Sequence, residues 1–236
     1  MDVNKSSYIF GFSIVMVVVV GVALAATAIT LKPFQKENVR QEKMQNILAS
    51  INVSVDRDGA EVLFDSIVKK QLVLKADGTE VEGTSAFNVD LSKEVKKGNE
   101  ERLNPLYIAE KDGKTFYILP LRGKGLWGPI WGFVSLEEDM NTIFGAKFDH
   151  KAETPGLGAE INRDFFSVQF KGKKIMDNGV FKSVAVVKGA SEGIYEVDGI
   201  SGGTITSVGV DEMLQDCISN YIPYFKSLGG NAQASL

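Results

Sequence analysis

The sequence contains one cysteine and one histidine among its 236 residues, and this scarcity excludes several kinds of functional site. Cys217 has no second cysteine to pair with, so an internal disulfide, a CxxC redox pair and a cysteine-ligated iron–sulfur cluster cannot form within this chain. His150 alone cannot build a zinc site from several histidines or a haem site from two. We therefore expect no metal site, and we can assemble no hydrolytic triad around His150.

Nucleotide-binding motifs and basic surfaces are missing as well. The net charge is −4 and no basic stripe stands out, which disfavours nucleic acid as a partner. The phosphate-loop pattern GxxxxGK[ST] is absent, and "GKGLWG" (123–128), which matches GxGxxG, precedes Pro129 and a strand-like run instead of a helix. We therefore expect a glycine-rich hairpin there, with Trp127 and Trp131 either in the core or lining a pocket.

What the sequence does have is an uncharged apolar run from Tyr8 to Leu31, long enough as a helix to cross a hydrocarbon layer of roughly 30 Å. A cleaved signal peptide is the alternative, because "ALA" (23–25) resembles a cleavage site. The run continues beyond that site and only Lys5 precedes it, so a retained transmembrane helix is favoured. More positive charges follow the run than precede it, and this count alone favours a cytoplasmic domain.

The remaining chain predicts a single α+β domain with a mainly antiparallel sheet and flanking helices. Asp77-Gly78 and Asp112-Gly113 predict hairpins, and 179–189 reads as one strand. Ser207 is the expected N-cap of a helix that extends to Phe225 and buries Cys217. We expect four parts: an N-terminal segment and transmembrane helix (1–31), a helical connector with a break from the span at Pro33 (32–71), the domain (72–228) and a flexible tail (229–236).

Two glycine-rich stretches are the candidate functional motifs. In "VDGISGGTITSVGV" (197–210), consecutive glycines precede a helix start, where free backbone N–H groups favour an anion such as phosphate, and Thr204 offers a hydroxyl. In "HKAETPGLGAEI" (150–161), glycines around Pro155 permit a close approach to a flat ligand, with His150 as a proton donor. For both stretches a structural turn is the alternative.

These motifs together resemble a known family. "VDGISGGTITS" is similar to the flavinylation motif in the FMN-binding domain of the C subunits of sodium-translocating NADH:quinone reductases, and "ETPGLG" (153–158) is a second mark of that family. The segments "WGPIWGFVSLEEDMNTIFGAKF" and "LKPFQKENVRQEKMQNIL" are also similar, so the resemblance covers nearly the whole chain. In one departure, Gly203 stands where the family usually has alanine, which loosens the turn but leaves the hydroxyl in place.

The resemblance implies a covalently bound FMN and the residues that hold it. Thr204 matches the threonine that forms a phosphoester with the FMN phosphate, and Gly202 and Gly203 belong to the same motif. Asp198 and Ser201 match motif residues that are read by a flavin transferase or support the turn. The residues implied to lie against or near the flavin are Glu153, Thr154, Leu157, Lys188 and Trp127.

The resemblance also implies a function and a location. The chain would relay electrons within a sodium-pumping NADH:quinone oxidoreductase, with NADH and the ion path handled by other subunits, so that it is not catalytic alone. Besides those subunits, its partners would be the flavin transferase and membrane lipid. The family places the FMN domain on the periplasmic side of the bacterial inner membrane, against the charge count, and we follow the family.

Three alternatives remain open from the sequence. One is the flavin subunit of the related ferredoxin:NAD oxidoreductase complex, which shares the domain and the threonine linkage. Another is a non-catalytic membrane-tethered sensor or regulator with the same flavin domain. The third is a membrane-anchored binding module without a cofactor.

Overall fold

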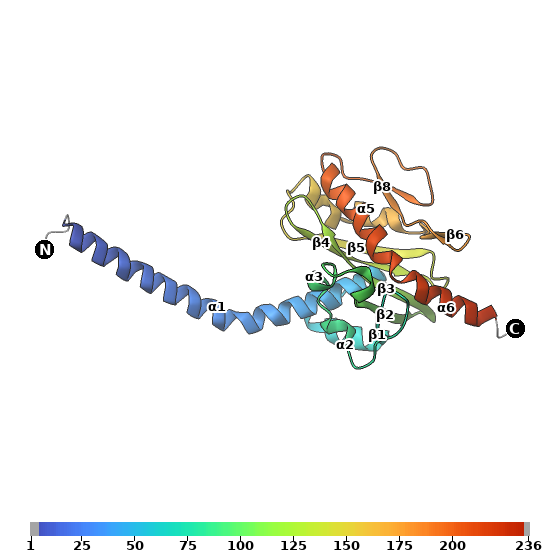
Figure 1. Cartoon of the computed structure of the whole chain (residues 1–236), viewed down its shortest axis with the longest axis horizontal. Helices are drawn as coiled ribbons and strands as arrows, with labels where there is room; N and C mark the ends of the chain where they lie inside the picture. Colours follow the sequence, from blue (N-terminus) through green and yellow to red (C-terminus); the bar gives the residue numbers. More distant parts are fainter. Residues whose placement is uncertain (1–4, 234–236) are drawn as a thin grey trace. The chain divides into compact units, whose positions relative to one another are not determined.

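The computed structural model describes residues 5–233, which divide into one unit up to Lys43 and a second unit from Met44. Helix α1 (Ser6–Ser50) runs through Pro33 without ending, so the break suggested by that proline is absent (Figure 1). Within the described residues, α1 is the one helix whose length and composition suffice to cross a membrane. Its last turns, from Met44 to Ser50, contribute buried side chains to the second unit.

A five-stranded antiparallel sheet organises the second unit, with its strands in the order β1-β2-β3-β4-β5. Two short strand pairs, β6–β7 and β8–β9, follow, and the second of these is parallel. The strands are β1 (Val68–Leu74), β2 (Asn104–Lys111), β3 (Lys114–Lys124), β4 (Pro129–Leu136), β5 (Ile143–His150), β6 (Met176–Asp177), β7 (Val180–Phe181), β8 (Ala185–Val187) and β9 (Glu196–Asp198). The predicted α+β fold with a mainly antiparallel sheet is confirmed.

Short and long helices surround this sheet. The α-helices of the second unit are α2 (Ala60–Ile67), α3 (Leu91–Glu94), α4 (Asp164–Ser167), α5 (Thr204–Ser219) and α6 (Ile222–Gln233). The 3₁₀ turns are Arg57–Gly59, Ala86–Asn88, Asn99–Glu101, Gly158–Asn162 and Val168–Phe170. Residues 229–233 of the expected tail thus continue α6, while residues 234–236 lie outside the described part of the chain.

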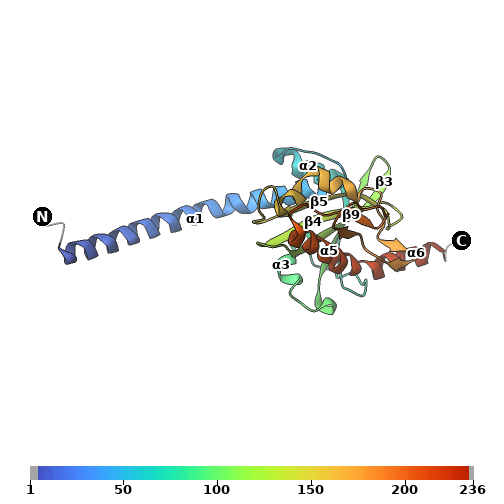
Figure 2. The same cartoon turned by 90° about the horizontal axis from the view of Figure 1, so that it is seen from above.

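The sheet is buried on both faces, as the side chains of β3 show. Phe116 and Ile118 point into a cluster with α2 and the end of α1, while Leu119 and Leu121 point into the cluster that contains α5 and α6. Figure 2 shows the helices that cover these two faces, with α2 and α5 on opposite sides of the strands. Because alternate residues face two cores, the apolar run of this strand is nearly continuous.

The predicted turn at 112–113 forms a full hairpin and the one at 77–78 a very short one, whereas the predicted strand 179–189 does not form. Asp112 (φ 52°) and Gly113 (φ 74°) form the predicted two-residue turn between β2 and β3. Asp77-Gly78 makes a smaller turn closed by one bridge, because β1 takes β2 as its partner. The expected single strand 179–189 is wrong: Ser183 adopts φ 62°, a left-handed conformation that separates β7 from β8.

Helix α5 begins at Thr204, with its N-cap four residues before the expected one. Gly203 is the N-cap and its carbonyl accepts the Ser207 N–H at 2.9 Å. Ser207 is not the cap because its Oγ is used elsewhere, accepting the Ile200 N–H at 2.9 Å. The helix ends at Ser219, and Cys217 is buried in it as predicted.

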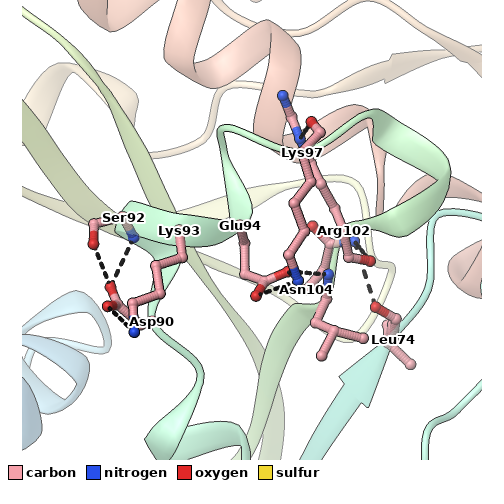
Figure 3. A network of polar contacts seen from close by, with 9 residues as sticks. Leu74, Asp90, Ser92, Lys93, Glu94, Lys97, Arg102 and Asn104 are labelled. Carbon is pink, nitrogen blue, oxygen red and sulfur yellow. Dashed lines mark hydrogen bonds and ion pairs between the residues drawn. The ribbon is translucent and has the colours of Figure 1, made fainter.

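A polar network holds the segment before β2 together (Figure 3), and Arg102 of this segment also reaches α5. The Glu94 carboxyl group, 8% exposed, accepts hydrogen bonds from Lys97 Nζ at 2.7 Å and from the Leu103 N–H at 3.0 Å. Arg102 Nη1 then donates to Asp216 Oδ2 at 2.6 Å. Asp90 caps α3, and its hydrogen bond from the Ser92 hydroxyl lowers the pKa of Asp90. Through Arg102 and Asp216 this segment holds the C-terminal half of α5.

Two glycines allow a test of the contact between the 75–79 turn and α6. Gly78 and Gly83 both have positive φ, but an added Cβ at Gly78 would lie 2.6 Å from the Tyr224 nitrogen, whereas one at Gly83 meets nothing within 4 Å. Gly83→Ala should cost roughly 1–2 kcal/mol of unfolding free energy through strain alone. Gly78→Ala should cost roughly 3 kcal/mol or more, because backbone cannot yield as a side chain can. Equal losses in denaturant titrations of the full chain would contradict this contact.

The environment of Cys217 also gives a prediction. Burial raises the pKa of its thiol to about 11 from an ordinary 9.0. Only the thiolate reacts with alkylating reagents, so at pH 8 the folded protein should be labelled at least roughly 100-fold more slowly than the unfolded protein. Iodoacetamide labelling followed by mass spectrometry, with and without denaturant, measures the ratio. A ratio near one would show that the thiol is accessible and not in the core.

Candidate functional site

Three segments distant in sequence meet around the carboxyl group of Glu153. These are the turn after β3, the loop after β5 and the first turns of α5. Glu153 is 4% exposed; its Oε1 accepts the Trp127 N–H at 2.8 Å and its Oε2 accepts the Thr206 hydroxyl at 2.6 Å. Its own N–H donates to His150 Nδ1 at 3.2 Å, which makes His150 an acceptor on this side of its ring. The carboxyl group therefore ties the three segments together.

Glycines make this close approach possible. An added Cβ at Gly125 would lie 2.6 Å from Glu153 Oε1, and one at Gly158 would lie 2.6 Å from Glu153 Oε2. An added Cβ at Gly209 would collide with the Lys124 carbonyl oxygen at the end of β3. The absent side chains leave the space that the buried carboxyl group and the α5 backbone occupy.

The N-terminus of α5 has the features of an anion site. It consists of the glycine turn and the first helical residues (201–206), and we call it the mouth of α5. Gly202 has φ 75°, and the buried Gly203 donates its N–H to the Ile200 carbonyl at 2.9 Å. The N–H groups of Thr204 and the two residues after it precede the first intrahelical hydrogen bond, and no acidic residue lies in this first turn. The Thr204 side chain is exposed. The mouth therefore offers donors and a hydroxyl to an anion, as a phosphate requires.

The motif aspartate Asp198 ends β9, and the candidate lysine Lys188 directly follows the neighbouring strand β8. The Asp198 carboxyl group accepts the Ser191 N–H, and the Asp198 N–H donates to Gln169 Oε1 at 2.8 Å. The N–H of Gly199 donates to the Val187 carbonyl at 2.8 Å, which places the start of the Lys188 loop beside the glycine turn. The Gly199–Val187 bond thus joins the ends of this loop and Asp198 holds it at Ser191, while the Lys188 side chain is exposed on it.

The loop 153–158 lies against the mouth. The Thr154 carbonyl accepts the Leu157 and Ala159 N–H groups, both at 3.1 Å, and closes a tight turn. An added Cβ at Gly202 would lie 2.7 Å from Leu157 Cδ2, so the loop and the glycine turn are in contact. Thr154 and Leu157 are exposed, as a residue facing a ligand needs to be.

Exposed apolar side chains surround this junction. Trp127 is 66% exposed on the hairpin turn, so it lies outside the core, whereas Trp131 is half-buried with the Arg122 guanidinium carbon 6.0 Å from its ring centroid. The large apolar residues exposed on the three segments are Leu126, Trp127, Leu157, Ile205 and Val208. Large exposed side chains gathered on converging segments are typical of a surface that receives a ligand or a partner.

The structure therefore brings together most of the candidate residues of the sequence. Ser201 and Thr204 are exposed at the mouth, and Trp127 and Leu157 come from the neighbouring segments. Glu153 differs from the expectation in its surroundings, because protein donors occupy both carboxyl oxygens. Thr206 was missed; its presence in the motif was visible, but its contact with a residue 53 positions away was not. The described residues contain no group of three His, Cys, Asp or Glu side chains that could hold a metal.

Comparison with known proteins gives consistent similarities. Residues 125–219 match the model of the FMN-binding domain family. The chain is 33% identical to the C subunit of the Na(+)-translocating NADH-quinone reductase of Pseudomonas aeruginosa, over 86% of this chain and 87% of that protein. It is 31% identical to the corresponding C subunit of the Neisseria meningitidis reductase, over 92% and 94%.

Solved structures agree with these sequence similarities. The crystal structure of the C subunit of a Na(+)-translocating NADH-quinone reductase from Parabacteroides distasonis aligns with a TM-score of 0.77 and 48% identity, covering 83% of this chain and 96% of that one. The structure of Shewanella oneidensis NqrC aligns with a TM-score of 0.70 and 26% identity, covering 81% and 98%.

The unusual glycine of the motif is open to a direct test. An added Cβ at Gly203 would lie 3.1 Å from Ile200 Cβ and Cγ2 and 3.2 Å from the Gly158 nitrogen, which is tight but can be relieved by small shifts. Gly203→Ala should therefore change the unfolding free energy by less than about 1 kcal/mol, whereas Gly209→Ala, pressed against backbone, should cost several-fold more. Denaturant unfolding of both variants checks this, and a Gly203→Ala loss as large as that of Gly209→Ala would contradict it.

Proposed function

Since the chain belongs to the family of Na(+)-translocating NADH-quinone reductase C subunits, we propose that it carries FMN bound covalently through a phosphoester at Thr204. It is a flavoprotein subunit of this oxidoreductase complex, and other subunits of the complex are its partners. The observation that supports attachment at Thr204 is its exposed hydroxyl on the first residue of α5, behind a glycine turn and beside free backbone donors.

The residues at the mouth suit the phosphate end of FMN. The backbone N–H groups at the start of α5 and the exposed Lys188 on the neighbouring loop supply donors and positive charge. Gly202 supplies the left-handed turn that leads into the helix, and Ser201 precedes it in the same turn. The Asp198 carboxyl group, at the end of β9, holds the neighbouring loop through the Ser191 N–H. The ester would join Thr204 Oγ to the FMN phosphorus with loss of the hydroxyl proton. The flavin transferase would take this FMN group from a flavin dinucleotide, whose phosphoanhydride bond breaks as the nucleoside monophosphate leaves with the bonding electrons.

The exposed apolar residues suit the ring end. Trp127 and Leu157 would cover the isoalloxazine and exclude water from it, with Thr154 offering its hydroxyl at the edge. The flavin supplies the electron-transfer chemistry when bound, and the protein positions it and sets its surroundings. Because a covalent cofactor stays in place, the site suits a fixed relay between partner subunits.

We further propose that α1 anchors the chain as a single-pass protein of the inner membrane, with the FMN-binding domain in the periplasm. The anchor is supported by the uncharged run between Tyr8 and Leu31 and by membership of a sodium-translocating complex. The periplasmic side follows the family resemblance alone, against the count of positive charges. The sodium-pump relatives favour this reading over the ferredoxin:NAD oxidoreductase subunit. Contacts with membrane lipid follow from the anchor.

The attachment is tested by replacing the hydroxyl. Thr204 is exposed, so Thr204→Ala should leave the fold unchanged and abolish covalent flavin, whereas Thr204→Ser keeps a hydroxyl and should retain it. In-gel flavin fluorescence is measured after complete denaturation, on full-length chain produced with an active flavin transferase. Wild type and Thr204→Ser should fluoresce and Thr204→Ala should not.

A fluorescent Thr204→Ala band equal to wild type would place the ester on another residue. An unlabelled wild-type band, with the transferase active on a control substrate, would contradict covalent attachment altogether.

A further inference from the structure

We propose that Glu153 and Thr206 are positioning residues for FMN attachment, which they control through a buried clamp without touching the cofactor. The proposal rests on the function proposed above and adds Thr206 to its machinery. Thr206 is 1% exposed and Glu153 is 4% exposed, so neither side chain offers a surface to a ligand. Their effect on the site therefore passes through the backbone segments that they join.

Each carboxyl oxygen of Glu153 accepts one hydrogen bond from the protein. Oε1 receives the Trp127 N–H at 2.8 Å and Oε2 receives the Thr206 hydroxyl at 2.6 Å, so one carboxyl group joins the hairpin turn to α5. Gly125 and Gly158 leave no free volume beside it, because an added Cβ at either would lie 2.6 Å from a carboxyl oxygen. The carboxyl group cannot rotate toward the cofactor side without breaking both bonds.

Helix geometry explains how the clamp acts on Thr204. Two residues along an α-helix correspond to a rotation of about 200°, so Thr206 points inward while Thr204 points outward. This agrees with their burial and exposure. Fixing Thr206 on the inner face sets the rotation of the first turn of α5, and with it the direction of the Thr204 hydroxyl and of the free N–H groups. In the same way, the Ser207 hydroxyl accepts the Ile200 N–H at 2.9 Å and holds the glycine turn that precedes the helix.

First turns of helices fray because their N–H groups lack intrahelical partners. Without the Thr206 hydroxyl, Glu153 Oε2 loses its donor inside the protein, and the first turn of α5 loses the hydrogen bond that fixes it to Glu153. The acceptor hydroxyl would then occupy many orientations, and attachment would slow without any contact to the flavin having been removed.

The test compares Thr206→Val, which keeps the shape and removes the hydroxyl, with Thr206→Ser, which keeps the hydroxyl. The matched control is Ser135→Ala, which removes another buried hydroxyl: Ser135 Oγ donates to the Ser50 carbonyl at 2.6 Å, between β4 and the end of α1. The full-length variants are incubated with flavin transferase and a flavin dinucleotide as the donor, and the initial rate of covalent flavin incorporation is measured together with the melting temperature. Hydrogen–deuterium exchange of the N–H groups of residues 207–210 is followed on the flavin-free chains.

We expect Thr206→Val to incorporate flavin at least tenfold more slowly and to exchange faster at the start of α5. Thr206→Ser should restore both toward wild type, and Ser135→Ala should lower the melting temperature without changing either. A Thr206→Val chain that is labelled at the wild-type rate would overturn the clamp, as would an equal slowing in Ser135→Ala. A wild-type chain that is never labelled at Thr204 would instead contradict the proposed function.

Discussion

The close approach of three backbone segments around one buried carboxyl group is the constraint on which the rest of the site depends. Glu153 receives donors from two different segments, and its own N–H is held by His150 at the end of β5. A buried carboxyl group without such donors would be costly, so the segments must keep these positions for the fold to remain stable. The same positions place the mouth of α5 between the loop 153–158 and the hairpin turn.

The double burial of the sheet provides the rigid support for this junction. The cluster on the face of α5 fixes that helix along its length, and Arg102 and Asp216 hold its second half. On the opposite face, the last turns of α1, from Met44 onward, pack with α2 in the second cluster. The Thr204 hydroxyl and the free N–H groups at the mouth therefore belong to a helix, α5, whose position is fixed by packing. Both attachment and electron transfer require such a fixed position.

Much of the fold followed from local patterns, because those patterns act over a few residues. The Asp112-Gly113 turn was predictable since its two residues favour the left-handed conformations that the structure shows. The start of α5 was not predictable in the same way. Ser207 has the residue type of an N-cap, but its hydroxyl oxygen accepts the Ile200 N–H instead of capping the helix. Thr204 and its glycines were found from their motif, but the link between Glu153 and Thr206 joins residues 53 positions apart and leaves no local signal.

The central claim is that one hydroxyl, Thr204, carries the cofactor. Its most direct test is mass spectrometry of the chain purified from the membranes of the cells that make it. Trypsin cuts after Lys188 and Lys226, so one peptide contains Thr204 together with Ser191 and Ser201. The account predicts that this peptide carries one flavin phosphate and that fragmentation places it on Thr204. An unmodified peptide, or a flavin on a different hydroxyl, would contradict it.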